Sequence, residues 1–112
     1  MMHFLNLHPA PFASIKAGLK DVEMRLYDEK RRMIKSGDKI TFTNNQSGET
    51  LVCLVKDIKV FNSFESLYLA YNKERLGYKS NERANPEDMK VYYPLAEMQA
   101  QGVCAIEIKL KN

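Results

Sequence analysis

Between a segment with helical spacing and a segment with strand spacing, the chain reads Gly18-Leu19-Lys20-Asp21-Val22-Glu23-Met24-Arg25. Over residues 21–27 apolar and polar side chains alternate, which predicts a β-strand. Because the apolar residues of such a strand face the core, Glu23 and Arg25 project together from its other face. Lys20 lies at the helix-to-strand junction and is free to turn toward the same side. We therefore expect these three charged side chains to form one cluster.

This charged cluster suits a planar polar ligand. Arg25 supplies a rigid fork of hydrogen-bond donors, Lys20 a compact positive charge, and Glu23 an acceptor that orients Arg25. The alternative is a solvated strand face with an ordinary surface ion pair, worth about 0–1 kcal/mol. Spacing alone leaves both interpretations open.

The residues before this segment predict a strand followed by a helix. Residues 3–7 form a short apolar strand, and Pro9 and Pro11 start a helix that ends near Gly18. The helix carries apolar side chains at helical spacing, namely Phe12, Ile15 and Leu19.

After it, the pattern predicts a hairpin and a long return strand. The charged run 28–35 is expected to be a helical turn, and a tight turn at residues 36–38 leads into a strand over residues 39–43. A loop at residues 44–48 then connects to a long strand over residues 51–60, a length suited to a small barrel.

Two further helices and a terminal strand complete the prediction. Asn62 and Glu65 resemble a capping box that opens a helix with an apolar stripe of Phe64, Leu67, Tyr68 and Tyr71. Residues 77–90 are poor in large aliphatic side chains, so we expect a mobile excursion over the core. Pro94 and Gly102 bracket a last helix at the N1 and C′ positions.

The final segment is a strand with one apolar face, made of Cys104, Ile106, Ile108 and Leu110, and a second face made of Ala105, Glu107 and Lys109. A strand near each end and a long hairpin between them predict an α+β fold, with a mixed β-barrel and short helices in its connections. Residues 1–112 are expected to form a single domain.

Composition excludes several classes of protein. The 112 residues are 45% hydrophobic and 28% charged, which excludes a disordered chain. The formal net charge of +3 is compatible with a nucleic-acid partner but does not decide the question.

Targeting and metal signals are also missing from the sequence. The N-terminus lacks the pattern of a signal peptide and no apolar run approaches about 20 residues, so we expect no membrane association and a cytoplasmic location. Cys53 and Cys104 lie in apolar runs and are expected to be reduced core residues. With His3 and His8 as the only histidines, no spacing offers a zinc site, and we expect neither a metal nor another cofactor.

The series G-x-K-x-x-E-x-R over Gly18, Lys20, Glu23 and Arg25 resembles the signature of the ASCH domain, a branch of the PUA-like superfamily. Supporting features extend almost end to end and include Gly37-Asp38-Lys39-Ile40, Tyr92-Tyr93-Pro94 and Ile106-Glu107-Ile108. The resemblance implies a small PUA-like β-barrel with short flanking helices. It also implies a cleft that receives RNA or a nucleotide.

One bacterial subgroup of this family implies a different function, that of an N(4)-acetylcytidine amidohydrolase. Its motif Lys, a hydroxyl residue three positions later and a distant Glu are the proposed catalytic residues. Lys20 matches the Lys and Glu74 corresponds to the distant Glu, but Glu23 stands where the subgroup has its hydroxyl. Because this removes the obvious nucleophile, the hydrolase is the alternative function, and a protein-interaction domain is the second alternative.

Other side chains are candidates by position. His8 could donate to a ligand or act as a base, or else cap or pack against the helix. Asn6 shares a strand face with His8 and could contact a base edge or cap the same helix. For Tyr68 and Tyr71 the alternatives are core packing and base stacking, and for residues 30–32 a solvated turn and a phosphate contact. We expect Tyr92 or Tyr93 to border the cleft. The oligomeric state is left open.

Overall fold

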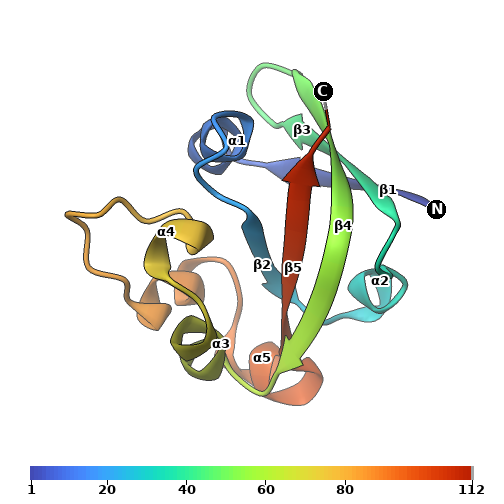
Figure 1. Cartoon of the computed structure of the whole chain (residues 1–112). Coiled ribbons are helices and arrows are strands. Elements are labelled where there is room, and N and C mark those ends of the chain that lie inside the picture. The colour runs from blue at the N-terminus through green and yellow to red at the C-terminus, as the bar shows by residue number, and fades with distance from the viewer. Residues whose placement is uncertain (112) are drawn as a thin grey trace.

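The computed structural model describes residues 1–111 as a five-stranded mixed sheet with short helices in its connections (Figure 1). The strands are β1 (Met2–Leu7), β2 (Val22–Leu26), β3 (Lys39–Asn44), β4 (Thr50–Phe61) and β5 (Val103–Leu110). The helices are α1 (Pro9–Lys16), α2 (Glu29–Arg32), α3 (Phe64–Ala70), α4 (Lys73–Leu76), the 3-10 helix η1 (Pro86–Val91) and α5 (Leu95–Gln101).

The strand order β1-β3-β4-β5-β2 places β1 and β2 at the two edges of the sheet, although they are consecutive in sequence. β1 runs parallel to β3, and the other neighbours are antiparallel. The sheet curls into a half-barrel, and Arg25 on β2 donates from Nη2 to the Asn6 carbonyl oxygen on β1 at 2.6 Å. We call the gap between these two edges, bridged by that hydrogen bond, the seam. The predicted α+β class is confirmed.

The long return strand that the sequence predicts is β4, which follows the hairpin and pairs with both β3 and β5. A register shift between Val55 and Asp57 bends it. Such a bulge increases local twist, which helps the sheet to curl.

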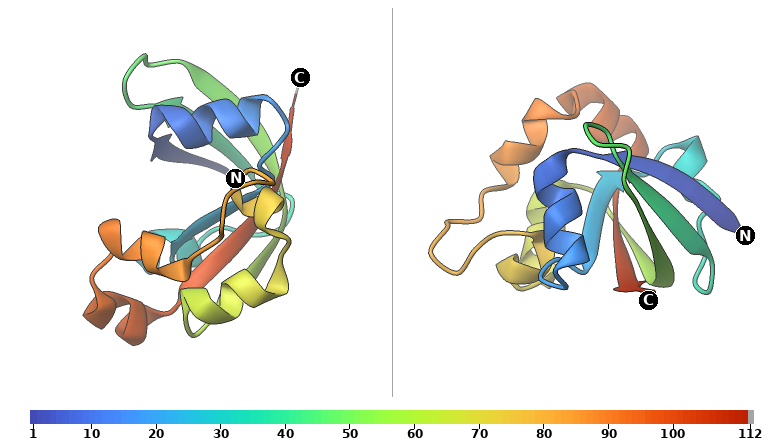
Figure 2. Two further views of the ribbon diagram at one scale, coloured as in Figure 1. Left: turned by 90° about the vertical axis from the view of Figure 1, so that its left-hand side faces the viewer. Right: turned by 90° about the horizontal axis from the view of Figure 1, so that it is seen from above.

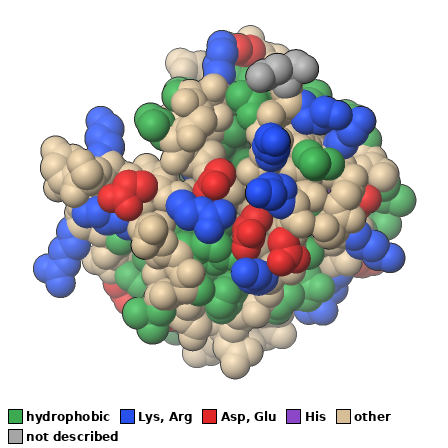
Figure 3. All heavy atoms as spheres, in the orientation of Figure 1, with side chains coloured by type: hydrophobic (Ala, Val, Ile, Leu, Met, Phe, Trp, Pro, Cys, Tyr) green, Lys and Arg blue, Asp and Glu red, His purple; other side chains and the backbone are tan. Residues whose placement is uncertain are grey.

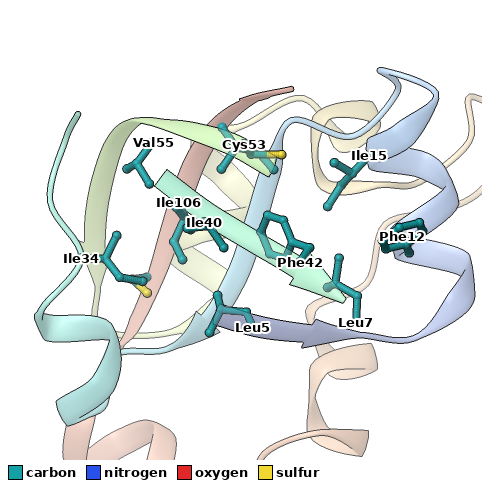
Figure 4. Packing of buried hydrophobic residues seen from close by; sticks show 12 residues of the cluster. Leu5, Leu7, Phe12, Ile15, Ile34, Ile40, Phe42, Cys53, Val55 and Ile106 are labelled. Atoms are coloured by element: carbon teal, nitrogen blue, oxygen red, sulfur yellow. The ribbon is translucent and has the colours of Figure 1, made fainter. Parts of the chain in front are cut away.

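The concave face of the sheet encloses the first hydrophobic core (Figure 4). Phe12 and Ile15 of α1, each 2% exposed, pack there against Ile40, Phe42 and other inward side chains of the sheet. Burying a side chain of this size stabilises the fold by about 1.5–3 kcal/mol. This packing anchors helix α1 on the sheet next to the seam. Cys53 and Cys104 are buried free thiols in this core.

A second core lies on the other face, under α3, α4, η1 and α5 (Figure 2). It joins Leu67 and Met89 to the outward side chains of β2 and β5. The prediction of one apolar face for the last strand is therefore incomplete, because Val103 and Ala105 on its second face are fully buried.

Residues 77–90 were expected to bury little surface, and this expectation is wrong in the second half of the segment. Pro86 begins the 3-10 helix η1, and Asn85 caps it by accepting a hydrogen bond from the Glu87 N–H at 3.0 Å. Met89 is buried in the second core. One well-placed methionine and local capping therefore replace the large aliphatic side chains that the segment lacks.

Three predicted positions at helix ends are shifted by one residue. The residue that caps α3 is Ser63, which accepts from the Ser66 N–H at 3.2 Å, and not Asn62. Pro94 occupies the N-cap of α5 and Gly102 its C-cap, where N1 and C′ were expected.

Charge is balanced over the middle of the face formed by β4 and β5. Figure 3 shows acidic and basic side chains next to one another there, in keeping with the ion pairs between Arg75 and Asp21 and between Lys59 and Glu107. No helix within residues 1–111 is long and apolar enough to cross a membrane.

Candidate functional site

A cavity of about 390 Å³ lies on the free edge of β2, at the seam. The end of β1 and helix α1 line one side, and the segment from α3 to Tyr93 lines the other. Its volume falls within the range of about 300–1,000 Å³ that is usual for small-molecule sites.

The charged cluster predicted from the sequence forms the polar part of this cavity. Glu23 uses both carboxylate oxygens: Oε1 accepts from Lys20 Nζ at 3.0 Å and Oε2 from Arg25 Nε at 2.8 Å. The side chains of Lys20 and Glu23 are only 8% and 5% exposed. The strand phase and the junction thus bring the three groups together as expected, in a buried setting and not on a solvated face.

Glu23 remains ionised to low pH. Burial by itself would raise the pKa of this carboxyl, but the charges of Lys20 and Arg25 and their hydrogen bonds outweigh it and lower the pKa to about 2. Glu23 is therefore an orienting acceptor, and a weak general base.

Lys20 reaches the cavity because helix α1 ends just before it. The backbone N–H of Lys20 donates to the Ser14 carbonyl at 3.1 Å, which closes the turn after α1. Gly77, in the left-handed conformation at φ 109°, then lies against the lysine stem: a Cβ at Gly77 would be 3.1 Å from Lys20 Cδ. Glycine at this C-cap thus leaves room for the lysine.

Tyrosine side chains make up much of the opposite wall. Tyr78 donates from its hydroxyl to Asp88 Oδ2 at 2.7 Å, and the Tyr68 hydroxyl lies 2.9 Å from that of Tyr78. Because Tyr78 gives its proton to Asp88, Tyr68 is the donor in the second bond. Burial raises the pKa of the Tyr68 hydroxyl, and the bond with Tyr78 raises it further. This wall presents neutral aromatic rings.

His8 and Tyr92 meet across the cavity, with ring centroids 5.9 Å apart and planes tilted by 36°. His8 occupies the N-cap of α1 without a side-chain cap bond, and its Nδ1 contacts Asn45 Nδ2 at 3.2 Å. The predicted alternative of Asn6 as the cap is therefore wrong. Asn6 lines the cavity, and its carbonyl oxygen accepts the hydrogen bond from Arg25.

Glu74 does not join the other predicted residues. It is exposed on α4 and does not line the cavity. Of the two candidate tyrosines on and after α3, Tyr68 lines the cavity. Tyr71 lies outside it and donates to Glu107 Oε2 at 2.7 Å. Tyr92 and Tyr93 both line it, and Tyr93 also stacks on Phe64.

The basic run on α2 makes contacts within the protein. Lys30 donates to the Phe4 carbonyl at 2.9 Å, and Arg31 pairs with Asp28 at 3.0 Å. Arg32 lies over the Tyr27 ring. These contacts favour the structural interpretation of the run over a phosphate site.

Sequence reasoning missed Ser14, Glu82 and Asp88, which also line the cavity. Ser14 follows Pro11 by three residues on α1, so helical spacing places it on the same side of the helix. Glu82 and Asp88 lie in the segment predicted to be mobile, so no periodicity pointed to them. Residues 1–111 contain no group of three or more side chains suited to hold a metal ion.

The curled sheet, the flanking helices and the polar cavity at its edge define an α+β half-barrel protein of the PUA-like type. The family model of the ASCH domain matches residues 5–111. The chain therefore belongs to the ASCH domain family.

Solved structures agree with this assignment. A crystal structure of the hypothetical protein PH0355 is 34% identical, with a TM-score of 0.84 over 99% of this chain and 100% of that chain. The solution structure of protein PF0455 from Pyrococcus furiosus is 33% identical, with a TM-score of 0.76 over 98% of this chain and 97% of the other.

A more distant likeness shows the fold alone. A crystal structure of a ZmASCH mutant from Zymomonas mobilis is 14% identical, with a TM-score of 0.67 over 96% of this chain and 67% of that chain. No curated protein sequence matched this chain.

Proposed function

We propose that this protein binds RNA or a nucleotide and holds one base in the cavity at the seam. The observation that carries the proposal is the combination of a buried charged cluster, Lys20, Glu23 and Arg25, with aromatic walls. Bases in single-stranded RNA are recognised by stacking on aromatic rings and by hydrogen bonds to their edges. Tyr68, Tyr78 and Tyr92 provide the rings.

The charges in the cavity favour a base over a phosphate inside it. Lys20 and Arg25 face three carboxyl side chains that line the same cavity, those of Glu23, Glu82 and Asp88. An anion would be repelled by the surplus of acidic groups, whereas a neutral polar ring would find donors and acceptors. We therefore propose that the phosphates of the ligand lie outside.

The amidohydrolase function takes second place because two of its three expected residues are unsuited. Glu23 has no hydroxyl, and Glu74 is exposed away from the cavity. The Ser14 hydroxyl lines the cavity together with Lys20, which is the observation in favour of hydrolysis. Acetate release from acetylated cytidine by the wild-type protein, abolished in Lys20→Ala, would place hydrolysis first.

The proposal includes a cytoplasmic location. Two buried free cysteines, Cys53 and Cys104, suit a reducing compartment.

Substitution of Arg25 tests the binding function. Arg25→Ala should weaken binding of a fluorescently labelled single-stranded RNA at least about tenfold, the loss expected from charged hydrogen bonds in a cavity. The matched control is Lys109→Ala, which removes one exposed charge from the outer face of β5. Affinity is measured by fluorescence anisotropy at several salt concentrations. In a plot of the logarithm of the binding constant against the logarithm of the salt concentration, each phosphate contact on a single strand steepens the negative slope by about 0.7.

Because Arg25 also bridges the seam, a second variant separates binding from folding. Tyr92→Ala removes an exposed ring that lines the cavity, so it should weaken binding without lowering the unfolding temperature. Equal losses in Lys109→Ala and the cavity variants would mean diffuse electrostatic attraction and would contradict the proposal.

A further inference from the structure

The free edge of β2 offers main-chain hydrogen-bonding groups to the cavity. In residues 1–111, β2 pairs with β5 alone, in antiparallel register. Ile108 N–H donates to the Asp21 carbonyl at 2.9 Å, and Tyr27 N–H donates to the Gly102 carbonyl at 3.0 Å. In an antiparallel pair the residues that bond to the partner alternate with residues that do not. Residues 21, 23, 25 and 27 therefore turn their backbone groups toward β5.

Met24 belongs to the other set. Its N–H and C=O point away from β5, as do those of Val22 and Leu26, and of these three residues Met24 is the one that lines the cavity. The residue is 7% exposed. Among the described residues, 1–111, no hydrogen bond outside the β2–β5 ladder joins the Met24 N–H or C=O to another group.

An unpaired main-chain donor and acceptor in a buried position is costly, and most such groups in proteins have a partner. Across the seam, the equivalent carbonyl of Asn6 on β1 already has one in Arg25. These unpaired groups belong to a residue that lines the cavity, so a molecule bound there would supply their partner.

We propose that the Met24 backbone contacts the hydrogen-bonding edge of the bound base: its N–H donates to a ring nitrogen or carbonyl oxygen, and its C=O accepts from a base N–H. This inference rests on the proposed function. Nucleobases carry such donors and acceptors side by side on their Watson–Crick edges. Side chains would then hold the ring, while the main chain of β2 selects its edge.

The geometry favours a base over an added peptide strand. Strand addition uses several successive edge positions. Here one position opens into the cavity, and Arg25 crosses the seam to Asn6 beside it. The aromatic rings of Tyr78 and Tyr92 suit a planar ligand.

The test uses the wild-type protein, labelled with ¹⁵N, and the four ribonucleosides as probes. We expect the amide resonance of Met24 to shift on titration with a nucleoside that binds, and that of Val22, on the same edge but outside the cavity, to shift less. If uridine binds, 3-methyluridine, blocked on this edge, should bind at least about tenfold more weakly, whereas 5-methyluridine should keep its affinity. Cytidine and adenosine are tested in the same way with their dimethylated exocyclic amines.

A pair of variants tests the same contact on the protein. Proline is tolerated in edge strands at positions whose N–H does not enter the ladder. Met24→Pro removes the backbone N–H together with the side chain, whereas Met24→Ala removes the side chain and keeps the N–H. We expect Met24→Pro to bind at least about tenfold more weakly than Met24→Ala. If Met24→Pro does not fold, the comparison of methylated nucleosides decides.

The outcomes separate this inference from the proposed function. Binding of nucleosides with no shift at Met24 and equal affinity for the edge-blocked forms would overturn the inference and leave the function standing. No binding of any nucleoside or RNA would overturn both.

Discussion

Glu23 is the residue that organises the site. It is almost completely buried, and each of its two oxygens holds one cation, the ammonium of Lys20 and the guanidinium of Arg25. Through Arg25 the same carboxylate also supports the bridge to β1. One side chain therefore serves both the cavity and the closure of the sheet.

We expect Glu23→Gln to lower the free energy of unfolding by about 3 kcal/mol, because it leaves two buried positive charges without their countercharge. This figure is the lower end of the range for a broken buried pair, since the cavity gives water some access. Urea unfolding at neutral pH measures the change.

Glu97→Gln, at an exposed carboxyl on α5, is the matched control and should change stability by less than about 0.5 kcal/mol. A Glu23→Gln protein as stable as wild type would show that the cluster is solvated and contributes little.

At the scale of elements, the contact between α4 and Lys20 links the second core to the cavity. Gly77 ends α4 in the left-handed region and packs on the lysine stem. The position of α4 therefore determines where the ammonium group of Lys20 lies.

Gly77→Ala should weaken nucleoside binding because its Cβ would displace Lys20, and should destabilise the fold by about 1 kcal/mol through its backbone conformation. Gly48→Ala is the matched control: Gly48 has φ 78°, but a Cβ there meets nothing within 4 Å. Calorimetric titration and thermal unfolding measure the two effects.

If both glycine variants lose stability and only Gly77→Ala loses affinity, the steric role of Gly77 is established. Equal affinity in the two variants would show that Lys20 adapts without cost.

The local pattern of apolar and polar residues predicted the individual strands and helices better than it predicted which strands pair in the sheet. Alternation placed β2 and the direction of Glu23 and Arg25, because a strand with one apolar face fixes side-chain phase. Nothing local indicated that β1 pairs in parallel with β3 or that β2 pairs with β5, since these contacts join segments far apart in sequence. Glu74 was a candidate through its correspondence to the distant Glu of the family subgroup, and its distance from Lys20 depends on how α4 packs.

The segment from residue 77 to 90 was misread for a different reason. Its order comes from hydrogen bonds between side chains, such as that from Tyr78 to Asp88, and from the single buried Met89. Apolar periodicity does not detect such contacts, so the part of the cavity wall formed by Tyr78, Glu82 and Asp88 was not predicted.

For the molecule as a whole, two carboxyl groups link stability to acid. The pKa of Asp38 is lowered to about 2 by hydrogen bonds from His3, from the Lys35 N–H and from the terminal amine, and that of Glu23 is lowered to about 2 by its ion pairs. Both groups bind protons less readily in the folded state. Their contribution is therefore complete above their ordinary pKa values, near 4 to 4.5, and is lost as the pH falls toward about 2.

We expect the free energy of unfolding to fall between about pH 5 and about pH 2, and the fall to be shallower in Glu23→Gln and in Asp38→Asn than in wild type. Urea unfolding at a series of pH values measures it. Identical slopes in all three proteins would assign the acid sensitivity to other groups.

The strand order also governs when the site can exist during protein synthesis. The ribosome makes β2, with Glu23 and Arg25, early, but β5, its ladder partner in the described chain, is made after every other strand. A nascent chain therefore carries the sequence motif without the cavity until β5 has been made. Binding of the proposed ligand can begin only after β5 has emerged, so that ligand would stabilise the finished fold and would not guide its early steps.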